Sequence, residues 1–340
     1  MSYFKERVNK RFLLHSCKAV VFILVILGLL FALSPVFMPK TNKDLRDSSA
    51  NGILAEPAGT IDVIIVGDSE AYCTFIPLRM WNDYGITSYV CGTPKQTLDY
   101  SEDFLRKAFK SQKPKVVVLE TNAIFRKFSL SSTLLIKADE RFSIYRYHDR
   151  WKKLSLSDFS SDVDNDYIEN DKGYRIDGSV KPGNVSGYMK PSDKKEKIPI
   201  KNKPYLKSIK ELCEENGAQL MLVSTPSLKN WNSERHNTVA ELAEEFGLEY
   251  IDMNTLKQDV PINWTKDTKD AGDHLNHIGA EKVTSYFGAY LNSKNIFTDH
   301  RNDKSFEDWN KAYKSFLKEV EKIKKQNKLN PDKKSKKTKS

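Results

Sequence analysis

A serine and a histidine far apart in the chain have the neighbours that a nucleophile and its base require. The apolar run at residues 61–66 ends at once in Gly67-Asp68-Ser69-Glu70, which predicts a buried strand followed by a turn. Open α/β sheets place their chemistry beyond the carboxyl ends of the strands, so Ser69 lies where a nucleophile would. Residues 270–276 (Asp-Ala-Gly-Asp-His-Leu-Asn) offer His274 as a base, with two acids nearby to orient its ring. This combination predicts serine-dependent acyl chemistry.

These two segments resemble the first and last sequence blocks of the SGNH (GDSL-type) hydrolase and acyltransferase superfamily. Gly67-Asp68-Ser69 corresponds to the first block, and His274-Leu275-Asn276 with Gly279 corresponds to the last. The resemblance covers about residues 61–125 and 205–291. It implies a three-layer α/β/α sandwich with a mostly parallel, flavodoxin-like sheet. It also implies an enzyme that hydrolyses or transfers acyl esters through a Ser-His-Asp acyl-enzyme mechanism.

The resemblance further implies an oxyanion hole. Gly92 and Asn122 occupy the places of the family's glycine and asparagine, so the N–H groups of Ser69 and Gly92 and the Asn122 amide are the expected donors. Such donors stabilise the charge that develops on the reacting carbonyl oxygen, and losing one commonly lowers the rate by about 10²–10³. Asn122 departs from the family pattern because it lacks the usual Gly-x-Asn-Asp setting.

The acid of the predicted triad has two candidates. The family's acid stands three residues before the histidine, where this chain has Ala271. Asp270 and Asp273 bracket that position, and either could orient the ring. Asp270 is preferred, because Asp273 is adjacent to His274 and must bend back to reach Nδ1.

Several polar and aromatic residues are candidate substrate contacts. An aromatic face stacks on a pyranose ring, and an Arg side chain forks a carboxylate or phosphate. The more common role of such residues is packing combined with a salt bridge, and both roles remain open. Glu70, directly after the serine, is shared with membrane-anchored relatives that modify teichoic acids with D-alanine. The candidate contacts are Glu70, His148, Arg150, Trp151, Trp231 and His236, with Arg235 beside the last two.

Other classes of site are not supported by the sequence. It has no His-x-x-x-His or Cys-x-x-Cys spacing and no glycine-rich loop that would cradle a phosphate, so we predict neither a metal nor a cofactor. The formal net charge of +10 is concentrated at the two ends. Residues 322–340 carry nine Lys against Asp332, and the body of the chain is slightly acidic. We therefore predict no nucleic-acid binding.

An uncharged segment near the N-terminus predicts a membrane anchor. Residues 19–37 (AVVFILVILGLLFALSPVF) are long enough to span the hydrocarbon layer as a helix. Basic residues crowd the preceding residues 1–18, so the positive-inside rule places that segment in the cytoplasm and the rest of the chain outside. A cleaved signal peptide is the alternative, but Pro35 directly after Ala32-Leu33-Ser34 disfavours cleavage there.

The rest of the chain is predicted to form one large domain with tails. Strand-like runs alternate with helical patterns, which predicts an α/β fold with a parallel sheet. A polar stretch at 126–200 breaks this rhythm and is predicted to be an insertion or lid. The predicted parts are a basic segment (1–18), an anchor (19–38), a linker (39–60), an SGNH-like domain (61–300), an amphipathic helix (301–323) and a Lys-rich disordered tail (324–340).

Together these features predict a single-pass protein of the cell membrane with its domain outside. Its expected activity is acyl transfer to, or ester hydrolysis on, a cell-surface polysaccharide. The expected partners are the glycan substrate and a membrane-embedded protein that supplies the acyl donor. A carbohydrate esterase that removes acetyl groups, and a non-catalytic glycan-binding scaffold of a surface-polymer system, are the alternatives.

Overall fold

The computed structural model of the protein describes residues 2–45, 47–129, 143–159 and 169–329. The chain forms two compact units, the first from Met1–Asp44 and Ser129–Asp164 and the second from Leu45–Phe128 and Asn165–Ser340. The predicted insertion at 126–200 is therefore divided between the two units. Its residues 130–142 and 160–168, and residues 330–340 of the predicted tail, lie outside the described part of the chain.

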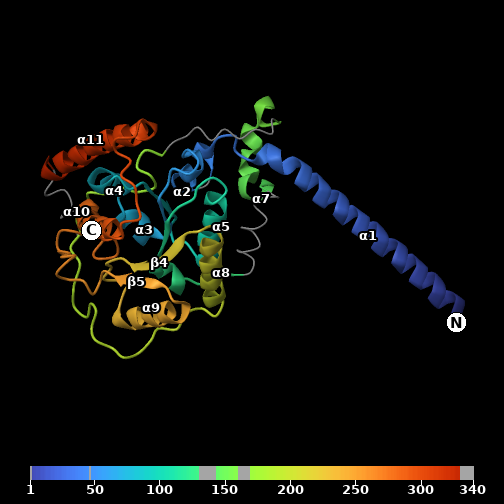
Figure 1. Ribbon diagram of the computed structural model, residues 1–340. Coiled ribbons are helices and arrows are strands. Elements are labelled where there is room, and N and C mark those ends of the chain that lie inside the picture. Colours follow the sequence, from blue (N-terminus) through green and yellow to red (C-terminus); the bar gives the residue numbers. More distant parts are fainter. Residues whose placement is uncertain (1, 46, 130–142, 160–168, 330–340) are drawn as a thin grey trace, which may run out of the picture. The chain divides into compact units, whose positions relative to one another are not determined.

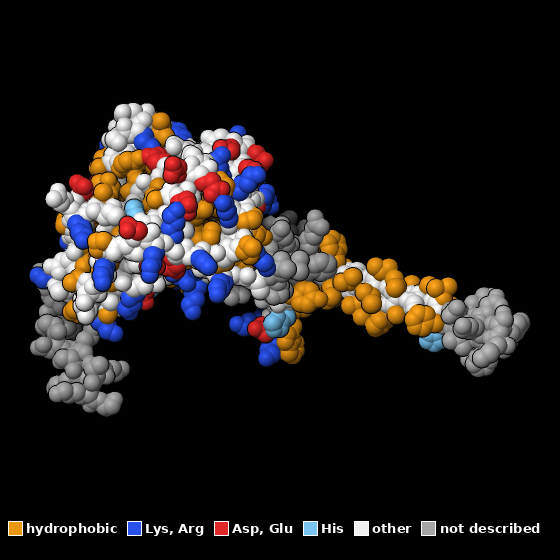
Figure 2. All heavy atoms as spheres, turned by 90° about the horizontal axis from the view of Figure 1, so that it is seen from below, with side chains coloured by type: hydrophobic (Ala, Val, Ile, Leu, Met, Phe, Trp, Pro, Cys, Tyr) orange, Lys and Arg blue, Asp and Glu red, His pale blue; other side chains and the backbone are white. Residues whose placement is uncertain are grey.

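The first unit contains one long helix, α1 (Ser2–Phe37). Its residues Phe12–Phe37 are, by length and composition, long and apolar enough to cross a membrane. Hydrophobic side chains line the face of this helix that Figure 2 presents. The helix also includes the predicted basic segment, since Lys and Arg are good helix formers. The other elements of this unit are η1 (Asn42–Asp44), α7 (Ile144–Tyr147), η4 (His148–Lys153) and η5 (Leu156–Phe159).

The second unit is built on a five-stranded parallel sheet with the order β2-β1-β3-β4-β5. This is the flavodoxin-like order, so the predicted α/β fold with a parallel sheet is confirmed. Residues of β1 and β3 are buried along their whole length, as expected of parallel strands covered on both faces. The strands are β1 (Val63–Gly67), β2 (Ser88–Gly92), β3 (Val116–Glu120), β4 (Gln219–Ser224) and β5 (Glu249–Asp252).

Helices cover both faces of the sheet (Figure 1). Alternate strand residues point to opposite faces, so Ile64 and Val66 belong to one apolar cluster and Val63 and Ile65 to the other. The first face packs against α5 (Leu98–Ala108), α8 (Asn202–Glu215) and α9 (Ser233–Phe246). The second packs against α3 (Ser69–Thr74), α4 (Pro77–Tyr84) and α10 (His277–Ser293), which completes the three layers.

Short and terminal segments add to this core. The predicted linker is shorter than residues 39–60, because α2 (Ser48–Asn51) and η2 (Gly52–Ala55) bury Ala50 and Ile53. This apolar contribution is too short to show a helical period in the sequence. After η6 (Lys304–Phe306), helix α11 (Glu307–Leu329) packs the Trp309 ring 5.5 Å from that of Trp81 on α4.

Candidate active site

The topology brings the ends of β1 and β3 together at the carboxyl edge of the sheet. Ser69 begins α3 directly after β1, and Asn122 lies in η3 (Thr121–Phe125) directly after β3. Because β1 and β3 are neighbours, both residues border the crevice where ligands bind in flavodoxin-like sheets. Gly67 pairs with Gly92 in the register of β1 and β2, which places Gly92 at the same edge.

A row of hydrogen bonds joins Ser69, His274 and Asp270. His274 Nε2 lies 2.7 Å from Ser69 Oγ, and His274 Nδ1 lies 2.6 Å from Asp270 Oδ2. The Asp270 carboxylate also accepts the backbone N–H of His274 at 2.7 Å, so it holds both the ring and the main chain of the histidine. This is the arrangement that a serine nucleophile, its general base and an orienting acid require.

The loop conformation explains why the acid stands four residues before the histidine. Ala271 and Gly272 both have positive φ angles, +66° and +87°. These two left-handed residues tighten the loop, so the Asp270 carboxylate faces His274 across one additional residue. Burial alone would raise the pKa of Asp270, but the hydrogen bonds from the His274 side chain and backbone outweigh it and lower that pKa. Asp270 is therefore an anion beside the ring.

Asp273 has a different environment. Its Oδ1 accepts a hydrogen bond of 2.7 Å from Asn230 Nδ2. Its Oδ2 lies 3.9 Å from the Lys229 ammonium. Of the two acids left open by the sequence, Asp270 is the one that contacts His274 Nδ1.

A segment from the predicted insertion braces the histidine loop. Lys181 N donates to Thr268 O and Ala271 N donates to Lys181 O, both at 3.0 Å. On the other side of the histidine, His277 N donates to Asp177 O at 2.8 Å. This part of the insertion holds the loop that carries His274 by main-chain hydrogen bonds, which do not depend on particular side chains.

Asp68, directly before Ser69, is fully buried and joins several elements. Its Oδ1 accepts the backbone N–H of Glu70 and so caps α3. Its Oδ2 accepts hydrogen bonds from Asn122 Nδ2 at 2.9 Å and from Arg126 Nε at 2.5 Å. A buried carboxylate is stable only when it is paired and hydrogen-bonded, and the Arg126 guanidinium supplies the opposite charge.

The other end of the Asn122 amide is held by Arg235. Arg235 Nη1 donates to Asn122 Oδ1 at 2.8 Å, while Nε and Nη2 form a forked pair with Glu196. The guanidinium also lies over the Phe125 ring, 4.5 Å from its centroid. These contacts define which end of the amide is the carbonyl, so Nδ2 faces the side of Asp68 and Ser69. One Nδ2 hydrogen is engaged by Asp68, and a role for Asn122 at an oxyanion would use the other.

Gly92 lies close to the backbone around Ser69. A Cβ atom at this position would lie 3.2 Å from Tyr72 Cδ1 and 3.4 Å from the carbonyl oxygens of Gly67 and Asp68. A side chain at this position would need the Tyr72 ring to shift by a few tenths of an ångström, so Gly92 packs tightly against the chain around Ser69. The residue that the family resemblance assigns to the oxyanion hole therefore lies beside the predicted nucleophile.

Glu70 is buried beside the same group. Its Oε1 accepts a hydrogen bond from Asn230 Nδ2 at 2.7 Å, and its Oε2 has no hydrogen-bond partner among the described residues. Burial, followed by the nearby charges of Asp68 and Glu120, raises the pKa of Glu70 well above its usual value. The neutral form of this side chain is therefore favoured more than is usual for a glutamate.

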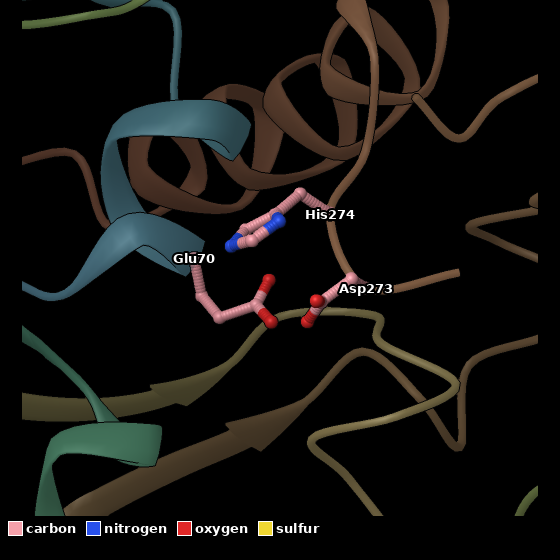
Figure 3. Close-up of side chains that lie close together, drawn as sticks. All are labelled: Glu70, Asp273 and His274. Carbon is pink, nitrogen blue, oxygen red and sulfur yellow. The ribbon is translucent and has the colours of Figure 1, made fainter. Parts of the chain in front are cut away.

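Glu70, Asp273 and His274 lie close together, and their side chains are of the types that bind metal ions (Figure 3). Their ligand atoms all lie within 4.8 Å of one another. Asn230 Nδ2, however, donates to both carboxyl groups and so stands where a cation would bridge them. Both nitrogens of His274 are also engaged, by Asp270 and Ser69. The group is a hydrogen-bonded cluster, and binding of a metal ion would require both sets of bonds to break.

Two of the predicted substrate contacts have structural roles. Trp231 is almost fully buried and donates its indole N–H to Asp252 Oδ2 at 3.0 Å. His236 Nδ1 lies 2.7 Å from the same oxygen, and this hydrogen bond raises the pKa of His236. Their prediction as substrate contacts is not supported, because both side chains are bound to the end of β5 instead of to the Ser69 group.

The other three predicted contacts belong to the first unit. Arg150 is engaged by the main chain at the end of α1, with Nη1 donating to Phe37 O at 2.8 Å and to Met38 O at 2.7 Å. His148 and Trp151 are exposed, and their described contacts are with Tyr145, Asp149 and Lys152. Arg150 also donates to Asp158 Oδ1 at 2.5 Å, and its role in binding an anionic substrate stays a prediction.

Several residues of this site gave no signal in the sequence. Arg126, Glu196 and Asn230 lie in segments without a motif, and only the fold brings their side chains to Asp68, Arg235 and Glu70. A polar residue in a loop is common, so sequence position alone could not have identified them.

A cavity of about 740 Å³ shares a loop with this site. Tyr188 and Trp264 meet edge to face in its lining, with ring centroids 5.3 Å apart. Tyr188 Oη donates to Asn254 Oδ1, which also accepts the N–H of Ser227 in the loop after β4. Ser227 Oγ in turn donates to Asp273 O at 2.7 Å, so the cavity wall and the histidine loop are directly joined.

No protein family model matches the chain, and no curated protein matches it in sequence. Among solved structures, the chain is similar to a lipase/acylhydrolase from Enterococcus faecalis, with 11% identity, a TM-score of 0.38 and coverage of 69% of this chain and 97% of that one. It is also similar to an esterase from Pseudoalteromonas sp., with 8% identity, a TM-score of 0.37 and coverage of 69% and 100%. A GDSL-like lipase from Bacteroides thetaiotaomicron matches with 10% identity, a TM-score of 0.35 and coverage of 68% and 88%. Likeness at this level does not extend to substrate or reaction.

The Asp68–Arg126 pair generates a stability prediction. Replacing Arg126 by Gln leaves a fully buried carboxylate without its counter-charge, so we expect the free energy of unfolding to fall by about 3–5 kcal/mol. Thermal unfolding of the full-length protein in detergent measures this loss. The control is Lys195→Gln, which breaks an exposed pair with Glu241 and should cost less than about 1 kcal/mol. Equal stability of the two variants would contradict the role given to Arg126.

The raised pKa of Glu70 predicts how the stability of the protein changes with pH. A carboxyl group whose folded-state pKa lies above its unfolded value stabilises the fold fully below that unfolded value, and this contribution is lost as the pH rises. The unfolding temperature of Glu70→Gln should therefore fall less than that of the wild type as the pH rises above the range in which an ordinary carboxyl group ionises. Replacing the exposed Glu211 by Gln should leave the wild-type slope unchanged. Parallel curves for wild type and Glu70→Gln would show that Glu70 is ionised in the folded protein.

Proposed function

We propose that this protein is a serine-dependent acyltransferase or esterase that is anchored in the cell membrane and modifies a cell-surface polysaccharide. The observation that carries the proposal is the hydrogen-bonded row of Ser69 Oγ, His274 and Asp270. A serine hydroxyl is a weak nucleophile until a base within hydrogen-bond reach removes its proton, and this row supplies the base and its orienting acid.

The proposed reaction has two halves. Ser69 Oγ attacks the carbonyl carbon of an acyl donor while His274 Nε2 takes its proton, and Asp270 stabilises the imidazolium that forms. The tetrahedral intermediate then collapses: the bond to the leaving group breaks, His274 returns the proton to that group, and an acyl-serine remains. In the second half His274 deprotonates a sugar hydroxyl, or water, which attacks the acyl-serine and releases Ser69.

The negative charge of each tetrahedral intermediate needs hydrogen-bond donors. The proposed donors are the backbone N–H groups of Ser69 and Gly92 and the amide of Asn122. Their support is the closeness of Gly92 to the chain before Ser69 and the contact of Asn122 Nδ2 with Asp68. Arg235 and Glu196 are placed to keep the Asn122 amide in the orientation that this role requires.

The proposed location follows from the sequence around α1. A helix long and apolar enough to cross a membrane is preceded by a basic segment, so the positive-inside rule directs the second unit to the outside. An enzyme in that place meets surface polysaccharides, and an acyl donor made inside the cell would need a partner membrane protein to reach it. The acyl groups proposed from the family resemblance are acetyl and D-alanyl.

The cavity of about 740 Å³ is the proposed place for the acceptor sugar. Its size suits a small saccharide, and Tyr188 and Trp264 offer the aromatic surface on which sugar rings stack. Removal of acetyl groups by hydrolysis remains the second candidate reaction, since water could take the place of the sugar hydroxyl.

The hydrogen-bonded row generates a prediction that separates the two acids. A serine-directed fluorophosphonate should label Ser69 in the full-length protein, and Ser69→Ala should abolish labelling. Asp270→Asn should slow labelling by about 10²–10⁴, because it removes the anion that holds the ring in its correct tautomer. Asp273→Asn is the matched control and should slow labelling less than about tenfold. A larger loss in Asp273→Asn than in Asp270→Asn would contradict the assignment.

A second experiment separates transfer, hydrolysis and the non-catalytic alternative. The full-length protein in lipid vesicles is given an acetylated glycan in one reaction and an unmodified glycan with an acyl donor in the other. Acyl groups on the second glycan support transfer, whereas release of acetate alone supports the esterase. If Ser69→Ala retains full function in cells and wild-type Ser69 is not labelled, the protein is a non-catalytic scaffold.

A further inference from the structure

The segment His148–Lys153 contains three of the substrate contacts predicted from the sequence, but the chemistry proposed at Ser69 does not involve it. It belongs to residues 143–159, which form α7, η4 and η5 and pack against the end of α1 in the first unit. These residues contact the part of the helix from which the chain leaves the candidate membrane span. We refer to residues 143–159 as the juxtamembrane cap.

The juxtamembrane cap supplies hydrogen-bond donors to the last carbonyl groups of α1. Ser143 Oγ donates to Ser34 O at 2.6 Å, and Arg150 Nη1 donates to the carbonyls of Phe37 and Met38. Lys40, just after the helix, donates to Pro35 O at 3.0 Å. The last carbonyls of a helix have no partner within it, and in an apolar layer no water replaces one. The carbonyls of Ser34, Pro35, Phe37 and Met38 therefore have protein donors at the end of α1.

The juxtamembrane cap also exposes large apolar side chains. Trp151, Leu156 and Phe159 are 62%, 91% and 66% exposed. Exposed apolar side chains gathered in so short a segment are unusual for a surface that faces only water. They belong to η4 and η5, which contact α1, a helix whose own apolar side chains are also exposed.

The charges of the juxtamembrane cap suit the boundary between lipid and water. Arg150 Nη2 donates to Asp158 Oδ1 at 2.5 Å, so the carboxylate balances the charge of the guanidinium at the end of α1. Lys152 and Lys153 are exposed and lie beside Trp151 in the chain. Tryptophan with flanking Lys or Arg is typical of segments that lie in the headgroup layer, where the ring contacts acyl chains and the charges stay in water.

We propose that the juxtamembrane cap lies in the headgroup layer of the membrane and binds lipid through Trp151, Leu156 and Phe159. Lipid is the occupant because the exposed apolar side chains lie in elements that contact a helix long and apolar enough to cross a membrane, and because basic residues flank them. The proposal rests on α1 crossing the membrane and is independent of the chemistry at Ser69. It assigns this part of the predicted insertion to the membrane.

Site-directed spin labelling of the full-length protein tests the proposal. A Cys17→Ala background removes the exposed thiol, while Cys73, Cys91 and Cys213 are buried. Nitroxides are placed at Leu156→Cys, at Phe159→Cys and at the control Lys194→Cys, an exposed position of the second unit. The protein is inserted into vesicles of phosphatidylcholine and phosphatidylglycerol, and insertion is verified by flotation.

Collisions with oxygen and with a water-soluble nickel complex report the surroundings of each label. At residues 156 and 159 we expect oxygen to relax the nitroxide more effectively than the nickel complex does. At residue 194 we expect the nickel complex to be the more effective of the two. Nickel-dominated relaxation at 156 and 159 in vesicles overturns the proposal. Shielding of these sites in native membranes but not in pure lipid also overturns it, in favour of a protein partner.

A pair of variants tests the anchoring of the juxtamembrane cap to α1. Arg150→Gln removes the donors to Phe37 and Met38, so the label at residue 156 should become more mobile and more accessible to nickel. Lys195→Gln is the control, because Lys195 is an exposed residue of the second unit outside the juxtamembrane cap, and it should leave both readings unchanged. Fluorophosphonate labelling of Ser69 in the same samples shows separately whether the proposed enzyme site is intact.

Discussion

The burial of the Asp68 carboxylate is the constraint on which the candidate site depends. A charge in the core of the second unit must be neutralised and hydrogen-bonded, and the partners of Asp68 are the N-terminus of α3, Asn122 and Arg126. These contacts connect the end of β1 to the end of β3. The residue that follows is Ser69, so the position of the hydroxyl and that of the Asn122 amide are set by the same buried anion.

The histidine loop is held in a different way. Asp270 bonds both the ring and the main chain of His274, and two left-handed residues make that geometry possible. The segment around Asp177 and Lys181 adds main-chain hydrogen bonds from outside the loop. One part of the long interruption in the α/β pattern thus supports the site, and another part, in the first unit, packs against α1.

Burial and the nearby acids raise the pKa of Glu70 next to the reacting atoms and so favour its neutral form. A carboxylate in this place would repel the oxyanion proposed to form nearby, whereas a carboxylic acid does not. The raised pKa of Glu70 therefore limits the negative charge beside Ser69, which follows Asp68 in the chain and is separated from Asp270 by the His274 ring.

The sequence by itself determined the order of strands and helices, the apolar helix near the N-terminus, and the pairing of an early serine with a late histidine. These follow from local composition and period, which a chain carries in every context. Only the tertiary structure decided that Asp270 and not Asp273 faces the ring, because that depends on the φ angles of Ala271 and Gly272. It also decided that Trp231 and Arg150 serve packing and helix capping, since a side chain's partners come from segments distant in the sequence.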